Sequence, residues 1–393
     1  MSYLIPRNFQ KIIGNVFYGQ FIQNLTVFLL SALLYLPVLY KQLSKVDMRF
    51  HLGLARELLS GESISTPHVL FHYLTAGTSW LLSVPIEYAG LLILLISIST
   101  AAVLIFNKTV VHFFWPAWMR IFFVQSLLIT NSISILYFFD KHTYYGYLYH
   151  NVYHNPTILL LKPFAIIIFF MSMSVFCKEI RCSRLFLLAL SLMIILSAIA
   201  KPSFLVVYLP AIAIFALFCE VRKGYVDWKS LVLYIFMPSL LILGYQYKMT
   251  YSSSFSSQYT SSIIFAPLEF MKNNSQYLLA KFLLSILFPL AVSVFCWSTV
   301  KYDKHLIFSW LIFLVGASQA YLLLEAGPRA MHGNLGWGAQ VGVFLLFITS
   351  ASHFFRNSTK GYSRIFVSSI FFMHVLCGIL FYAKEYLRPW EFW

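Results

Sequence analysis

The chain has 393 residues, of which 60% are hydrophobic and only 10% are charged, and its mean hydropathy is +0.77. This composition excludes a soluble globular domain and predicts a single all-α polytopic membrane domain over residues 1–393. The net charge of +15 comes from 28 basic and 13 acidic residues. We expect membrane lipids as partners, and no nucleic acid, because basic residues of a membrane protein gather in the loops that stay in the cytoplasm.

Apolar runs follow one another along the whole sequence, and a helix needs about 20 mainly apolar residues to span a bilayer. Eleven runs come close to this length, at 22–40, 87–106, 121–139, 157–177, 185–200, 203–220, 231–247, 279–298, 306–324, 336–354 and 364–383. A weaker run, 68–86, contains His72, Thr75 and Pro85, and we interpret it as an interfacial or re-entrant helix. If this run also crosses, the count becomes twelve, and that alternative stays open.

Basic residues cluster in alternate connections between these runs, and the positive-inside rule places such connections in the cytoplasm. The clusters are Arg7 and Lys11; Lys108 and Arg120; Lys178, Arg181 and Arg184; Arg222, Lys223 and Lys229; Lys301 and Lys304; and Arg356, Lys360 and Arg364. The N-terminus then lies inside and the C-terminus outside. Four segments with unusual polar content face outward, namely 41–86, 140–156, 248–278 and 325–335.

The first outer segment, 41–86, is predicted to hold interfacial helices. In KVDMRFHLGLARELLSGE, leucines alternate with Arg49, Arg56 and Glu57, which is typical of an amphipathic helix lying on a membrane surface. Asp47 and His51 are four residues apart and share one face of such a helix. A surface helix whose charged side chains are simply solvated, without a functional role, fits the same pattern equally well.

The second outer segment, 140–156, reads DKHTYYGYLYHNVYHNP and contains five tyrosines. Tyrosine is common at membrane interfaces, so an aromatic belt accounts for these five residues. A belt does not account for Asp140, His142, His150 and His154. We therefore expect this segment to form one wall of a polar cavity that faces outward.

Three cations stand at the outer ends of apolar runs. Lys162 lies inside the run that follows HNPT, Lys201 lies in AKPSF between two runs, and Arg329 lies in LLLEAGPRAMHGNLGWG. A buried, unpaired cation is costly in a membrane, so each should face a cavity, an anion or a protein partner. We expect the three head groups to converge on a phosphate.

The third and fourth outer segments differ in character. Glu325, Arg329 and His332 lie among turn-forming glycines between two apolar runs, and this pattern is typical of a lined cavity. An ion pair between Glu325 and Arg329 that ties the loop explains the same residues. The segment 248–278 is rich in serine and threonine and is predicted to be a mobile lid, although a simple connector has the same composition.

This arrangement resembles the GT-C superfamily of integral membrane glycosyltransferases. The likeness is architectural and covers roughly the first 160 residues: Asp47 soon after the first span, TPHVLFHYLTAG as a second interfacial helix, and Asp140 in the next outer loop. The resemblance implies a polyprenyl-phosphate-linked sugar donor, an extracytoplasmic glycan or lipid acceptor, and a role in cell-surface polysaccharide assembly. It further implies the inner membrane of a bacterium, with the active site facing outward. The usual acidic pair of the first loop is reduced here to Asp47 alone.

The residue types then suggest individual roles. A carboxylate can take the proton of the attacking acceptor hydroxyl, so Asp47 is the first candidate for the base and Asp140 the second. The predicted substrate-binding residues are Arg49, His51, His142, His150, His154, Lys162, Lys201, Glu325, Arg329 and His332. The cofactor is left unknown, since a divalent metal bridged by Asp47, Asp140 and histidines fits the residue types but no ligand spacing requires it.

Two other functions remain open at this point. A Wzy-like O-antigen polymerase or ligase also uses a lipid-linked saccharide, but it would centre on arginines in outer loops. A non-enzymatic flippase or carrier of lipid-linked glycans would carry charges along the whole translocation path, whereas the polar residues here gather in the outer segments.

Overall fold

The computed structural model describes residues 7–64, 66–142, 144, 146–177, 182–222, 226–251, 262–357 and 361–387. In chain order its elements are α1 (Arg7–Gln42), α2 (Val46–Leu59), α3 (Leu70–Leu82), α4 (Ile86–Lys108), the 3-10 helix η1 (Val110–His112), α5 (Ala117–Ile129), α6 (Tyr137–Asp140), α7 (Pro156–Cys177), α8 (Arg184–Ala200), α9 (Ser203–Val221), α10 (Trp228–Leu231), the π-helix η2 (Val232–Phe236), α11 (Met237–Tyr251), β1 (Ile263–Phe265), α12 (Glu269–Asn274), α13 (Leu278–Ser285), α14 (Leu287–Phe295), α15 (Trp297–Val300), α16 (Lys304–Leu322), β2 (Leu323–Glu325), the 3-10 helix η4 (Gly327–His332), α17 (Gly336–Asn357) and α18 (Tyr362–Leu387).

Apolar helices dominate this part of the chain. Eight of them are long and apolar enough to cross a membrane, and the pair α13 and α14, bent by 64° at a short break, gives a ninth if it forms one span. Two shorter apolar helices, α5 and α8, complete the set. The protein is therefore an all-α polytopic membrane protein, as predicted, while the count of eleven spans stays a prediction.

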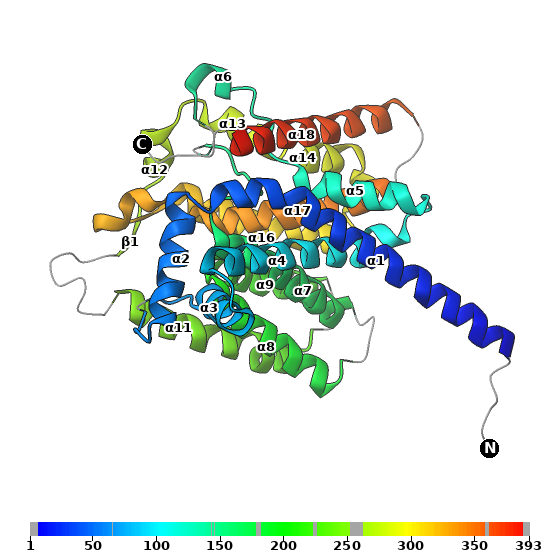
Figure 1. Cartoon of the computed structure of the whole chain (residues 1–393). Coiled ribbons are helices and arrows are strands. Elements are labelled where there is room, and N and C mark those ends of the chain that lie inside the picture. Colours follow the sequence, from blue (N-terminus) through cyan, green and yellow to red (C-terminus); the bar gives the residue numbers. More distant parts are fainter. Residues whose placement is uncertain are drawn as a thin grey trace.

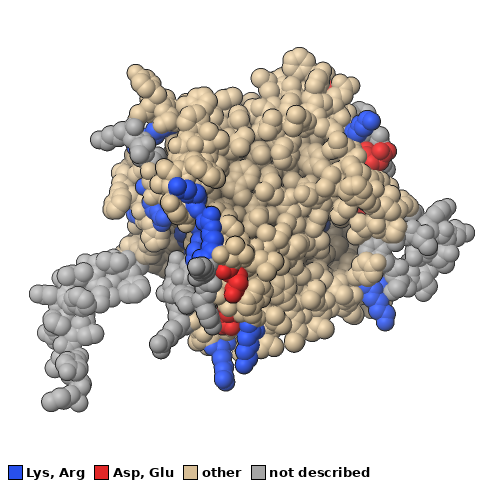
Figure 2. Space-filling view, turned by 180° about the vertical axis from the view of Figure 1, so that it is seen from behind, with Lys and Arg blue, Asp and Glu red and all other residues tan. Residues whose placement is uncertain are grey.

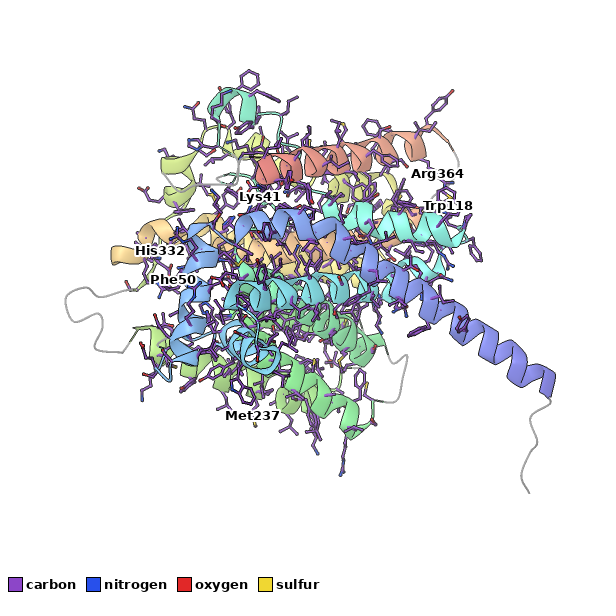
Figure 3. All side chains as sticks on the ribbon, viewed as in Figure 1. Lys41, Phe50, Trp118, Met237, His332 and Arg364 are labelled. Carbon is purple, nitrogen blue, oxygen red and sulfur yellow. The ribbon has the colours of Figure 1, made fainter. Side chains whose placement is uncertain are left out.

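The long helices run roughly along one direction, and α2 runs across them at one end of the bundle (Figure 1). Phe50 and His332 lie at this end, which we call the α2 end, and Trp118 and Arg364 lie at the other, which we call the Trp118 end (Figure 3). Phe50 of the first outer segment predicted from charge and His332 of the fourth thus lie at the same end. Figure 2 shows a wide uncharged area between patches of Lys, Arg, Asp and Glu, as expected of a lipid-facing surface.

The central helix pair is α16 and α17, which share the most extensive contact in the described fold. Glycines on both helices permit this closeness. A Cβ on Gly342 would lie 2.8 Å from the Cα of Phe313, and a Cβ on Gly316 would lie 2.8 Å from the Cα of Ala339. Backbones this close gain dispersion contacts that bulkier residues would block, and small residues are favoured at helix interfaces in lipid for this reason.

The structure contradicts the single helix predicted over 121–139. Helix α5 ends at Ile129, and the chain is not helical again until α6. Backbone groups of this stretch form hydrogen bonds with other elements. The N–H of Asn131 donates to the carbonyl of His374, and the N–H of Ile133 donates to the carbonyl of Leu284. Non-helical backbone is tolerated at membrane depth only when protein partners replace the missing helical bonds.

Candidate functional site

Asp47 is positioned by the amphipathic helix α2, whose buried face comprises Met48, His51, Leu52 and Ala55. The spacing of these residues repeats every three to four positions, so they form one stripe that packs against α3 and α4. Leu52 packs against Gly90 of α4, where a Cβ would come within 2.7 Å of the leucine side chain. This packing fixes the first turn of α2, which carries Asp47, at the end of the bundle.

The carboxylate of Asp47 meets the start of α7. Its Oδ2 lies 3.9 Å from Nε2 of His154 and accepts a hydrogen bond of 3.1 Å from Nδ2 of Asn155. The Oδ1 of Asn155 in turn accepts from the N–H of Ile158 at 3.2 Å and from the hydroxyl of Thr157 at 2.8 Å. Asn155 therefore caps α7 and ties its N-terminus to Asp47. The Asp47 side chain stays 27% exposed, so it remains accessible from the end of the bundle.

Lys201 brings a buried cation to the same place. It follows the last residue of α8, its Nζ donates to Oγ1 of Thr157 at 3.0 Å, and it lies 4.9 Å from the ring centroid of Trp337. Burial lowers the pKa of Lys201 to about 8, while the negative charge of Asp47 raises it. The ammonium is therefore still charged at neutral pH, beside an aromatic face that favours a cation. His154 differs: burial lowers its pKa to about 4 although Asp47 opposes this, so its imidazole is neutral.

Three histidines from the first outer segment form a cluster beside this cation. The Nδ1 of His51 and the Nε2 of His72 are 2.9 Å apart, and the ring centroids of His51 and His68 are 6.1 Å apart. Burial lowers the pKa of all three imidazoles, and the positive charge of Lys201 contributes at His51 and His68. The Nδ1 of His68 is buried without a hydrogen-bond partner among the residues that the structure describes. All three rings are neutral at pH 7 and can donate or accept hydrogen bonds.

Asp140 belongs to a separate ion pair. Its carboxylate pairs with the ammonium of Lys281, which also donates to Oγ of Ser275 at 2.5 Å and lies 5.1 Å from the ring centroid of Tyr147. Burial opposes ionisation of Asp140, but the bond from Lys281 and the backbone N–H of His142 lower its pKa below the usual range. A paired carboxylate of low pKa is a weak base. The ion pair therefore fits a structural role better than a catalytic one.

Lys162 lies in a third polar cluster, inside the bundle. Its Nζ donates to Oδ1 of Asn151 at 2.7 Å and lies 4.6 Å from the ring centroid of Phe344. The Nδ2 of Asn151 donates to the carbonyl of Thr130 at 2.7 Å, and Nε2 of His150 is 2.8 Å from Oγ1 of Thr130. No hydrogen bond or ion pair described here joins Lys162 to Lys201. Their convergence on one phosphate stays a prediction.

Glu325 and Arg329 form the ion pair that the sequence left as an alternative, at 3.1 Å between Oε1 and Nε. Asn334 donates to the other oxygen of Glu325 at 2.7 Å. Strand β2, which ends at Glu325, pairs antiparallel with β1, and Ile263 stands opposite Glu325. Arg329 nevertheless acts on the histidine cluster, because its positive charge contributes to the lowered pKa of His68. The loop that carries Glu325 and Arg329 is therefore held by its own ion pair and also lies near the histidine cluster.

The remaining candidates are more peripheral. Arg49, His142 and His332 are exposed on the outside of the fold. In the segment predicted as a lid, 252–261 lie outside the described residues, while its later part forms β1 and α12. No group of three His, Cys, Asp or Glu side chains in the described part of the chain stands close enough to hold a metal ion.

The structure thus brings together Asp47, His51, His154 and Lys201, with Arg329 at the edge, and places Asp140 and Lys162 in other clusters. We call Asp47, His51, His68, His154 and Lys201 the Asp47 cluster. The list of candidates from the sequence omits His68, His72 and Lys281. The occurrence of two histidines, His68 and His72, within five residues of the apolar stretch TPHVLFH was the available signal.

No protein-family model matches the sequence, and no curated protein matches it either.

Proposed function

We propose that this protein transfers a sugar from a polyprenyl-phosphate-linked donor to a glycan or lipid acceptor, with the Asp47 cluster as its active site. The observation that supports this proposal is that an accessible carboxylate, Asp47, lies near enough to a buried ammonium, Lys201, to raise its pKa, at one end of a membrane bundle. A base beside a fixed cation suits a reaction that removes a proton from an acceptor and releases an anionic phosphate.

In the proposed reaction the acceptor hydroxyl loses its proton to Asp47 while its oxygen attacks the anomeric carbon of the donor. The bond between that carbon and the phosphate oxygen breaks, and its electron pair leaves with the lipid phosphate. Lys201 stabilises the charge that develops on this leaving group, and its burial makes the interaction stronger than in water. The half-buried guanidinium of Arg329, whose charge contributes to the lowered pKa of His68, adds positive charge at the edge of the same site.

Sugar recognition falls to the neutral side chains of the cluster. His51, His68 and His154 can each donate and accept hydrogen bonds to sugar hydroxyls, because their low pKa values keep them uncharged. Among the described residues the buried Nδ1 of His68 has no hydrogen-bond partner, which supports this role, since buried polar atoms normally have partners and a ligand would supply one.

The proposal includes a topology of eleven crossings in which the α2 end faces outward. Basic clusters that the positive-inside rule uses support this orientation: Lys108, Lys304 and Arg356 line one cavity, and Arg364 lies at the Trp118 end (Figure 3). Helices α2 and α3 then lie in the outer interface rather than crossing. The short helix α5 completes its crossing with the non-helical chain that follows it.

The deciding experiment follows product formation from a polyprenyl-phosphate-linked sugar by the purified protein in detergent or proteoliposomes. Asp47→Asn keeps the size and the hydrogen bond to Asn155 but cannot take a proton, so turnover should fall by about 10²–10⁴-fold. Glu57→Gln is the matched control, because Glu57 is an exposed acid on the same helix and should have little effect. Full activity of Asp47→Asn would remove Asp47 as the base. Transport of the lipid-linked sugar across the bilayer without any transfer by the wild type would instead favour a carrier.

A further inference from the structure

A polar cavity of about 520 Å³ opens at the Trp118 end, on the opposite side of the bundle from the Asp47 cluster. It lies where α4 and α17 end and α16 begins, and its lining includes Lys108, Lys304, His305, His353 and Arg356. Its volume is in the range of small-molecule sites in proteins. Lys304 and Arg356 come from neighbouring helices, so the cations reach this cavity from different elements.

One acid, Asp303, is part of the cavity lining, and its carboxylate is already occupied. Its Oδ1 accepts from the N–H of Leu306 at 3.1 Å, which caps α16, and its Oδ2 lies 2.6 Å from Nδ1 of His353. Although burial opposes it, the bond from His353 lowers the pKa of Asp303 below the usual range. The oxygens of Asp303 are therefore engaged by the helix and by His353, and within the described residues Asp303 forms no ion pair with Lys108, Lys304 or Arg356.

The three cations of the cavity are Lys108, Lys304 and Arg356. Lys108, Lys304 and Arg356 form no ion pair within the described parts of the chain. Tyr302 and Ser352 add hydroxyl groups to the lining, whereas the lining hydroxyls of Thr109, Thr299 and Thr349 donate to backbone carbonyls of their own helices or turns. A cavity lined by three cations that form no ion pair with the described residues, and by two further hydroxyl groups, has the chemistry of a phosphate site, because phosphate oxygens accept both charged and neutral hydrogen bonds.

We propose that this cavity binds a phosphate-bearing anion, as a site separate from the Asp47 cluster. Topogenic charge alone would explain basic residues anywhere at this end of the bundle, as Arg184 and Lys229 show. It does not explain why Lys108, Lys304 and Arg356 line one cavity. A basic cavity between helices at this end suits the headgroup of an anionic lipid or a soluble phosphate compound.

Two binding assays on the full-length purified protein test the proposal and separate the two sources. In the first, native mass spectrometry counts phosphatidylglycerol and phosphatidylcholine retained by the detergent-solubilised protein. In the second, the thermal unfolding temperature is followed during titration with inorganic phosphate, against sodium chloride of equal ionic strength. The same assays are run on Lys304→Gln/Arg356→Gln and on the control Arg184→Gln/Lys229→Gln, which removes the same number of exposed charges away from the cavity.

We expect the wild type and the control to bind in at least one assay and the cavity variant to bind about tenfold more weakly or worse. Retention of phosphatidylglycerol alone assigns the site to a lipid headgroup, and stabilisation by phosphate assigns it to a soluble anion. All substituted residues are exposed, so both variants should fold, and the unfolding temperature without ligand checks this. Absence of anion binding by the wild type, or equal loss in both variants, would overturn the proposal whatever the activity of the Asp47 cluster.

Discussion

The carboxylate of Asp47 lies 3.9 Å from Nε2 of His154, although Asp47 follows the first membrane helix and His154 precedes α7. The contact joins two outer segments that the sequence alone could only place on the same side of the membrane. It brings an accessible acid and a neutral imidazole next to Lys201, whose charge persists at neutral pH. The proposed chemistry depends on this meeting of α2, the start of α7 and the junction between α8 and α9.

The charge of Lys201 sets an upper pH limit for the proposed reaction. Burial lowers its pKa to about 8, so turnover should fall as the pH rises through 8 and the ammonium is lost. The measurement is the pH dependence of kcat/KM with the lipid-linked donor. Lys201→Arg should move this fall to higher pH, because a guanidinium stays charged. An identical alkaline limb in wild type and Lys201→Arg would mean that another group controls it.

The buried histidines should make the protein sensitive to acid. Burial lowers the pKa of His72 to about 4 and holds that of His51 well below its usual value of 6.5. Below pH 6.5 the unfolded chain therefore binds protons that the folded protein does not, and the free energy of unfolding falls as the pH falls from 6.5 towards 4. His72→Gln should flatten this dependence in thermal unfolding between pH 7 and pH 4.5. His332→Gln, at an exposed site, should leave the slope unchanged, and an equal slope in all three proteins would contradict the prediction.

The ion pair of Asp140 with Lys281 should matter more for stability than for turnover. Asp140→Asn removes the negative charge that pairs with the buried ammonium of Lys281, which should cost about 1–3 kcal/mol in the free energy of unfolding. Asp140→Asn/Lys281→Met removes both charges and should recover much of this loss. Unfolding in detergent measures the stability, and turnover per folded molecule should stay near the wild-type value. A large loss of turnover with unchanged stability would return Asp140 to the role of base.

The proposed orientation can be tested by cysteine labelling in intact cells or sealed vesicles, after replacement of the native cysteines. Phe265 and Tyr302 are both exposed, Phe265 at the α2 end and Tyr302 at the Trp118 end. Phe265→Cys should react with a membrane-impermeant maleimide from outside, and Tyr302→Cys only after the membrane is opened. Labelling of both residues from the same side would contradict the eleven-crossing topology.

Much of the fold follows from the sequence, because a run of about 20 apolar residues in a membrane protein has few alternatives to a spanning helix. The end of helix α5 at Ile129 could not be predicted from the sequence, because the residues that follow it are apolar enough to continue the helix. Its conformation depends on bonds to His374 and Leu284, which belong to remote elements. The neighbouring residues in the sequence do not indicate such remote hydrogen-bond partners.

The site was predictable in part. Asp47, His51, His154 and Lys201 stood out because ionisable residues are rare in this chain, and the structure places them together. Lys281 and the pairing of Asp140 with it could not be foreseen, because the two residues are 141 positions apart and Lys281 lies in an apolar run. Whether an acidic side chain can act as a general base or is held in an ion pair depends on its neighbours in the folded structure, which the sequence does not specify.

The non-helical stretch after α5 also has a consequence for biosynthesis. The carbonyl of Asn131 accepts from Nδ1 of His374, 243 residues further along the chain, and the N–H of Asn131 donates to the carbonyl of the same histidine. While the chain is being made, this stretch enters the membrane long before α18 exists. Until the last helix has been inserted, its backbone groups must form hydrogen bonds with water, lipid headgroups or the insertion machinery. A truncated chain that ends before α18 therefore lacks the hydrogen-bond partners of the Asn131 backbone. Correct assembly of the bundle thus depends on the last helix.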